Sequence, residues 1–174
     1  MGRALELLGY RVCGPVGTRD PDIARKALAL ALTESERHDA FQDNPWPVLF
    51  REMDERHPGS KFVLTLRPAA DWIRSACAHF GHESTPMRAW IYGAGAPLGN
   101  EQRYLERYGR HERDVRAHFA ARPADLLVLA LPDPDPWAKL CPFLGAPRPA
   151  ARFPWINRDA RRSWRTRLRG LLRR

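Results

Sequence analysis

The chain has 174 residues, of which 44% are hydrophobic and three are cysteines, and its formal net charge is +9. This length can bury one sizeable core, and we therefore expect one domain. The sequence contains no apolar run of about 18 residues and no secretory signal at its start, so we expect neither a membrane span nor secretion. The cysteines at 13, 77 and 141 are odd in number and lack metal-ligand spacing. We interpret them as buried thiols of a cytoplasmic protein, and we predict no metal site.

The positive charge is concentrated at the end of the chain. Residues 148–174 hold ten arginines and one acid, Asp159, which leaves 19 of the 29 basic and 19 of the 20 acidic residues in 1–147. A nucleic-acid-binding domain would carry a basic face within its fold, so we expect no nucleic-acid partner. We predict an α/β domain over 1–147 and an Arg-rich extension over 148–174.

The first elements alternate between helix and strand. Apolar residues at 4, 5, 7 and 8 predict a short helix that ends at Gly9, and residues 10–13 predict a strand. The apolar spacing from Ile23 to Leu32 predicts a second helix, which begins near Asp20 and Pro21. We interpret this second helix as a packing element without chemistry.

Residues 38–47 are polar, aromatic and rich in proline, and we expect them to form a loop between two helices. His38, Asp39 and Asp43 are the candidates there for a general base, because loop residues can face a site. We name Asp43 as the candidate catalytic residue. The favoured alternative is that Asp43 caps the following helix, since an Asp or Asn before proline is a common helix opening.

The central pattern is a strand, an arginine and a helix. Residues 62–66 form an apolar run typical of a buried strand, and the apolar spacing from Ala69 to Phe80 predicts a helix with Pro68 near its start. Arg67 therefore lies where a strand ends and a helix begins. Ligands bind at this edge of a parallel sheet, because helix N-termini and free N–H groups meet there. Ser75 lies about two turns into the helix.

The segment 84–100 contains glycines at 93, 95 and 99 but lacks the spacing of a dinucleotide-binding motif, so we expect a mobile loop on the substrate side. Residues 100–121 predict a long helix. We interpret the histidines at 111 and 118 as surface and packing residues, because no cluster of other ligands accompanies them.

The last elements repeat the alternation. Residues 126–131 predict a second buried strand, and residues 133–137 open a predicted helix that runs through Leu144 and ends at Gly145. The acids at 133 and 135 suit capping and turn roles better than a catalytic pair. The alternation of strands and helices predicts an α/β fold with a parallel sheet.

Apolar residues at 164, 168, 171 and 172 fall on one face of a predicted basic helix. Such a helix in residues 161–174 would bind an anionic membrane surface or an acidic partner. The alternative, which we favour for one short segment, is a solvated tail.

One set of residues indicates a family. The strand is followed by Arg67, then by Trp72, Arg74 and Ser75, and it is preceded by Asp-Ala-Phe-x-Asp-x-Pro from Asp39 and by Pro-Gly-Ser-Lys-Phe from Pro58. This order resembles bacterial P-loop sulfotransferases. The resemblance implies a P-loop NTPase-like parallel sheet flanked by helices. It also implies that a sulfuryl group is transferred from 3′-phosphoadenosine 5′-phosphosulfate (PAPS) to a hydroxyl or amine of a small molecule or glycan.

The resemblance implies further that Arg67 and Ser75 bind the 3′-phosphate of PAPS or of its product 3′-phosphoadenosine 5′-phosphate (PAP). No metal is implied. One departure is local, since Arg67-Pro68-Ala69 stands where the family has Arg-Asp-Pro, and we expect the turn to differ in detail.

A second departure lies at the start of the chain. The family opens with a strand and a Gly-Thr-rich loop that cradles the 5′-phosphosulfate, and residues 1–10 resemble the helix that follows this loop. We therefore expect an N-terminally truncated relative with doubtful activity, in which absence of the central strand leaves two unpaired internal sheet edges. The alternative is a non-catalytic α/β module that binds a nucleotide or a protein and is anchored by its basic tail.

Overall fold

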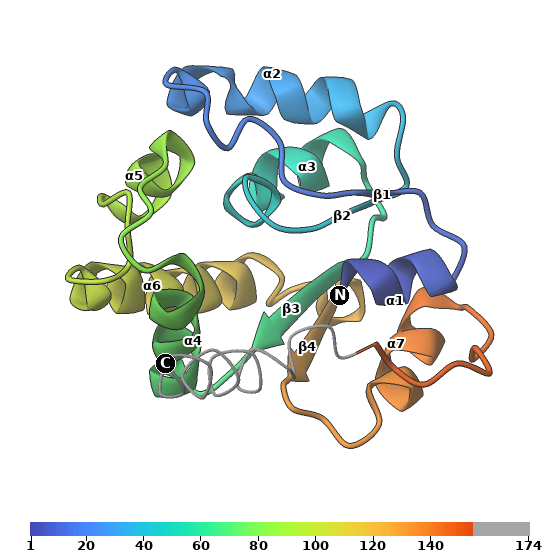
Figure 1. The fold of residues 1–174 in the computed structure, drawn as a ribbon. Helices are drawn as coiled ribbons and strands as arrows, with labels where there is room; N and C mark the ends of the chain where they lie inside the picture. The colour runs from blue at the N-terminus through green and yellow to red at the C-terminus, as the bar shows by residue number, and fades with distance from the viewer. Residues whose placement is uncertain (155–174) are drawn as a thin grey trace, which may run out of the picture.

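The structure is a computed structural model, and it describes residues 1–154 (Figure 1). The helices of this part are α1 (Gly2–Leu7), α2 (Ile23–Ser35), α3 (Phe50–Arg56), α4 (Ala69–Phe80), α5 (Pro86–Tyr92), α6 (Glu101–His118) and α7 (Pro136–Leu144). The strands are β1 (Val12–Cys13), β2 (Ala40–Phe41), β3 (Phe62–Leu66) and β4 (Leu126–Ala130), and the short 3₁₀ helices are η1 (Trp46–Val48) and η2 (Pro123–Asp125). The predicted basic helix at 161–174 lies outside the described residues.

The described strands form two separate two-stranded parallel sheets, where the sequence predicted one sheet. β1 pairs with β2, and β3 pairs with β4 so that Phe62 lies opposite Leu126 and Leu66 lies opposite Ala130. Unpaired internal sheet edges were predicted from the sequence. At β3 and β4, the facing backbone groups bond to each other instead. The mixed α/β class is confirmed, with parallel pairing in both sheets.

The pair β3 and β4 is covered by helices on both faces. Val63 and Leu127 face a cluster with Ala4 of α1 and Trp137 of α7. The alternate strand residues face a second cluster, whose buried members are Phe50, Leu64, Val115 and Phe119 from α3, β3, α6 and the end of α6. Successive strand side chains point to opposite faces, so one short apolar run supplies both clusters. Figure 1 shows α1 and α7 on one side of this sheet and α6 on the other.

A third cluster surrounds the small sheet of β1 and β2. Cys13 packs there with Ile23, Ala27 and Ala31, which repeat every four residues along α2. Trp46 belongs to the same cluster, and its indole Nε1–H donates to the carbonyl oxygen of Gly14 at 2.8 Å. The interpretation of α2 as a packing helix is therefore confirmed.

Two segments that were predicted to be loops contain regular structure. Residues 38–47 include the strand β2 and the helix η1, and residues 84–100 include the helix α5. The sequence held signals for α5: Thr85 caps it by accepting from the N–H of Arg88 at 3.2 Å, and Gly93 ends it at φ 72°. A loop was predicted because of the glycines at 93, 95 and 99, which end α5 or follow it.

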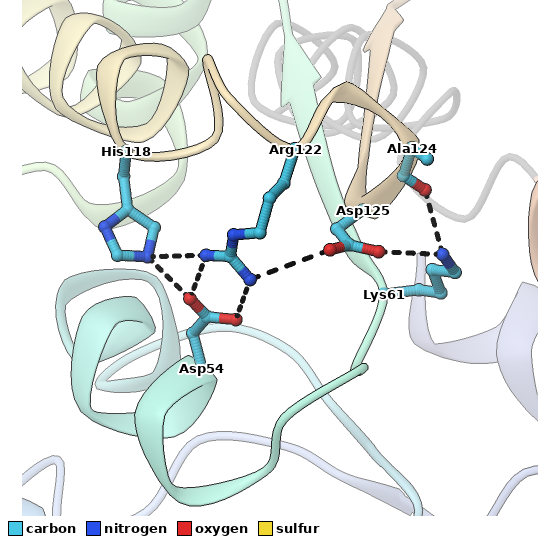
Figure 2. Close-up of polar contacts among 6 residues, drawn as sticks. All are labelled: Asp54, Lys61, His118, Arg122, Ala124 and Asp125. Atoms are coloured by element: carbon cyan, nitrogen blue, oxygen red, sulfur yellow. Dashed lines mark hydrogen bonds and ion pairs between the residues drawn. The ribbon is translucent and has the colours of Figure 1, made fainter.

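An ion-pair network around the buried Asp54 joins α3 to the end of α6 (Figure 2). Asp54 is 7% exposed, and its carboxylate lies 2.7 Å from Nε2 of His118 and accepts two hydrogen bonds from Arg122. Beside it, Lys61 donates to Asp125 at 2.9 Å and to the carbonyl oxygen of Ala124 at 2.9 Å. The hydrogen bonds from Arg122 are the main reason that the pKa of Asp54 is lowered. His118 is thus a packing residue, as predicted.

Among the described residues, no helix is long and apolar enough to cross a membrane. The three cysteines are free thiols, of which Cys13 and Cys141 are buried and Cys77 is half-buried.

Candidate functional site

Arg67 occupies the predicted position between the end of β3 and the start of α4. Its backbone is held from α6, because its N–H donates to the Tyr108 hydroxyl at 2.9 Å and that hydroxyl donates to the Arg67 carbonyl at 3.0 Å. The residue itself is exposed. The fold therefore fixes the place of Arg67 and leaves its guanidinium accessible.

The surroundings of Arg67 favour an anion. No acidic side chain of residues 1–154 lies within ion-pair distance of its guanidinium. Pro68 takes the N-cap position of α4 and supplies no side-chain cap, so the first N–H groups of α4 remain available. Asp71 in the first turn is neutralised by an ion pair with Arg74. An anionic oxygen at this corner would meet one positive charge and the positive end of a helix dipole.

Ser75 is exposed on α4, and its hydroxyl makes no hydrogen bond within the described part of the chain. It follows the start of the helix by six residues, which places it about 9 Å along the helix axis. A ligand that touches both Arg67 and Ser75 would extend along α4. The structure describes no contact between these two side chains.

An aromatic cluster of Trp72, Tyr92, Tyr104 and Tyr108 lies beside Arg67 and joins α4, α5 and α6. Trp72 stacks on Tyr108 with ring centroids 4.5 Å apart, and Tyr92 stacks on Tyr104 at 4.1 Å. The centroids of Trp72 and Tyr92 are 6.2 Å apart, which links the two stacks. This cluster fixes Tyr108, and through it the backbone of Arg67.

Asp43 follows β2, and its backbone adopts the left-handed conformation with φ 64°. The predicted helix cap is wrong, because η1 has no side-chain cap and only the Asp43 carbonyl accepts from the N–H of Trp46, at 3.0 Å. The carboxylate is exposed and has no cationic partner within ion-pair distance in residues 1–154. It stays accessible, and its catalytic role stays a prediction.

The other two base candidates are occupied by neighbours. Asp39 accepts two hydrogen bonds from the Arg11 guanidinium, at 2.8 Å and 2.9 Å, and these lower the pKa of Asp39 to about 2. Such a carboxylate is a poor proton acceptor near neutral pH. His38 lies with its Nδ1 3.3 Å from a carboxylate oxygen of Glu34.

A second cation, which the sequence did not predict, lies near the aromatic cluster. Arg107 of α6 is half-buried, and burial lowers its pKa, with Arg110 and Arg51 acting in the same direction. Burial, followed by the charge of Arg107, also lowers the pKa of His111 to about 4, so this imidazole is neutral near pH 7. Arg107 lies three residues after Tyr104 and four before His111. This spacing placed it on the inner face of α6 and could have revealed it.

A protein-family model described as a sulfotransferase domain matches the chain twice, over residues 1–98 and over residues 86–162. Together the two matches cover most of the chain. The chain belongs to the sulfotransferase domain family. No curated protein shows significant sequence similarity to it. Arg67, Ser75 and Asp43 all lie within the first match of this sulfotransferase domain, and Arg107 lies within the second.

Proposed function

We propose that this sulfotransferase domain has a P-loop NTPase-like fold and binds PAPS and PAP, with Arg67 and Ser75 at the 3′-phosphate. The single observation that carries this proposal is the exposed guanidinium of Arg67, without an acidic partner in residues 1–154, at the uncapped N-terminus of α4. A phosphate there would accept charge-assisted hydrogen bonds from Arg67 and backbone N–H groups.

In the proposed reaction, an acceptor hydroxyl or amine attacks the sulfur of PAPS in line with the bond to the 5′-phosphate. A new bond to sulfur forms, the bond between sulfur and the phosphate oxygen breaks, and PAP leaves. Asp43 is the proposed base that takes the proton of the acceptor, because its exposed carboxylate has no ion-pair partner in the described part of the chain and accepts only a hydrogen bond from the Gln42 amide, at 3.3 Å. We assign no residue of this chain to the 5′-phosphosulfate.

Calorimetric titration with PAP tests the proposed binding site. We expect Arg67→Ala to weaken PAP binding by about 10- to 100-fold, because a charge-assisted hydrogen bond contributes about 1.5–3 kcal/mol. Ser75→Ala should weaken binding about fivefold, as expected for a neutral hydrogen bond. The matched control is Arg25→Ala. Arg25 is an exposed arginine of α2, away from α4, and it pairs with Asp22.

An unchanged affinity of folded Arg67→Ala would overturn the assignment of the 3′-phosphate site. Formation of PAP from PAPS with a panel of hydroxyl and amine acceptors then tests transfer separately. Tight PAP binding without any transfer would favour the non-catalytic nucleotide-binding module over the enzyme.

We further propose that the Arg-rich end of the chain binds an anionic membrane surface. Residues 155–174 contain eight arginines and one acid, and each arginine near an anionic surface contributes about 1 kcal/mol. Deletion should begin after Pro154, because Arg148 pairs with Asp135 at 2.8 Å and the Ala151 carbonyl accepts from Trp137 at 3.0 Å. The boundary at 147 and 148 remains a prediction.

We expect this deletion to lower co-sedimentation with phosphatidylserine vesicles at least tenfold and to leave PAP affinity unchanged. Neutral vesicles and high salt are the controls, because both weaken electrostatic binding. Equal vesicle binding of the full and shortened chains would remove the anchoring role.

A further inference from the structure

Beside the small sheet, Cys13 meets two side chains that follow it by more than 20 residues, Glu34 and His38. One ligand atom each from Cys13, Glu34 and His38 lies within 4.8 Å of the other two. Cys13 belongs to β1, Glu34 lies near the end of α2, and His38 follows that helix. A thiol, a carboxylate and an imidazole form a mixed set of sulfur, oxygen and nitrogen donors. Zn²⁺ binds all three donor types, whereas Mg²⁺ and Ca²⁺ require oxygen ligands.

The distances suit a tetrahedral ion. In such a site, bonds of about 2.1 Å separate a nitrogen from an oxygen ligand by about 3.4 Å. His38 Nδ1 and Glu34 Oε2 are 3.3 Å apart. The same nitrogen lies 3.1 Å from the backbone carbonyl oxygen of Glu34, a contact that it would give up if it bonded to the ion. The side chains of His38 and Glu34 are 28% and 27% exposed, so an ion can enter from solvent and a water can take a fourth position. The sulfur of Cys13 lies within 4.8 Å of a ligand atom of each of the other two residues, and it would move closer to them on binding the ion.

The backbone around these residues is tied down. The Cys13 side chain is buried in the cluster that also contains Ile23, Ala27 and Ala31 of α2. The N–H of Asp39 donates to the Arg11 carbonyl at 2.9 Å, and the two side chains form an ion pair. The segment that carries His38 is therefore fixed beside β1. A metal site that exists before the ion arrives has a smaller ordering cost.

A divalent cation would also bring opposite charge to the carboxylate of Glu34, and it would deprotonate the thiol of Cys13 on binding.

We propose that Cys13, Glu34 and His38 form a zinc-binding site that joins the end of α2 to β1. The ion would bond to the sulfur of Cys13, a carboxylate oxygen of Glu34 and one ring nitrogen of His38. The site is independent of the sulfuryl-transfer proposal. It replaces the expectation from cysteine spacing that the chain has no metal site.

Titration with Co²⁺ and then Zn²⁺ tests the site in the full chain, after chelation and under a reducing atmosphere. We expect one equivalent of Co²⁺ to produce the near-ultraviolet absorption of a thiolate-to-cobalt bond, and one equivalent of Zn²⁺ to remove it. Cys13→Ser should abolish this absorption. Glu34→Gln and His38→Gln should each weaken Zn²⁺ binding at least about tenfold, since even changes to groups around metal ligands cost 10- to 100-fold.

Cys77→Ser and Cys141→Ser are the matched controls, and both should keep the absorption. Urea unfolding gives a second readout, because Zn²⁺ should raise the midpoint of the unchanged chain and not that of His38→Gln. Absence of the absorption in the unchanged chain, or its persistence in Cys13→Ser, would overturn the proposal. So would unaltered Zn²⁺ affinity in both folded Glu34→Gln and His38→Gln.

Discussion

Arg122→Ala should lower the free energy of unfolding at pH 7 by clearly more than the loss of an ion pair between two exposed side chains. The variant leaves the Asp54 carboxylate, which is 7% exposed, with His118 as its remaining partner (Figure 2). Removing one partner of a fully buried ion pair costs about 3–5 kcal/mol. The Arg122 side chain is 42% exposed, so solvent screening makes the expected loss of stability smaller here. Urea denaturation followed by circular dichroism measures the loss.

The control is Arg116→Ala, which removes an exposed pair with Glu112 one turn away on α6. It should change the free energy of unfolding by less than about 0.5 kcal/mol. A similar loss in both variants would show that the Asp54 network contributes no more than a surface pair.

The difference in the free energy of unfolding between the unchanged chain and Arg122→Ala should depend on pH because of Asp54. Its pKa in the folded protein lies below the unfolded value of about 3.9, mainly because of the hydrogen bonds from Arg122. The stability that this carboxylate contributes is complete above the unfolded value and is lost as the pH falls through the lower folded value. The gap between the unchanged chain and Arg122→Ala should therefore narrow below about pH 4.

Trp137→Ala should destabilise the fold by about 3–5 kcal/mol, which is the largest effect that we expect from one substitution. Trp137 is 2% exposed and fills the cluster between α7, α1 and the face of β3 and β4. Its Nε1–H donates to the Ala151 carbonyl at 3.0 Å, and its ring meets Phe153 edge to face at 4.9 Å. Far-UV circular dichroism during urea unfolding measures the change without relying on the removed indole.

Trp137→Phe keeps most of the ring and removes the indole donor, so it should cost only about 1–2 kcal/mol. Leu28→Ala, at a side chain that is 40% exposed on α2, should change stability by less than about 0.5 kcal/mol. A loss below 1 kcal/mol for Trp137→Ala would mean that α7 is not packed on the sheet as the structure shows.

The elements that the sequence predicted well are those whose signal is local. The apolar run of residues 62–66 and the stripe that follows it predicted β3 and α4, and they placed Arg67 between the two. The predicted long helix was also confirmed as α6. Its apolar positions repeat over many turns, which makes the sequence signal strong. The family followed from the residues around the same strand.

Short elements with weak local signals were missed. β2 has two residues, too few to show alternation, and only its pairing with β1 makes it a strand. The Asp43 cap was predicted from the common preference of Asp before proline, but the chain there adopts a left-handed turn, and the carboxylate accepts from the Gln42 amide instead of capping η1. In both cases the neighbouring segment decided the conformation.

The sequence by itself determined the α/β class, the order of the main helices and strands, and the position of Arg67 at the end of a strand. Only the tertiary structure decided what surrounds that position. Tyr108 reaches the backbone of Arg67 across 41 residues, Arg122 reaches Asp54 across 68, and Cys13 meets Glu34 and His38 beside β1. Periodicity records which face of a helix is apolar, but not which distant segment packs against it. Contacts between segments far apart in the chain therefore appear only once the helices have packed.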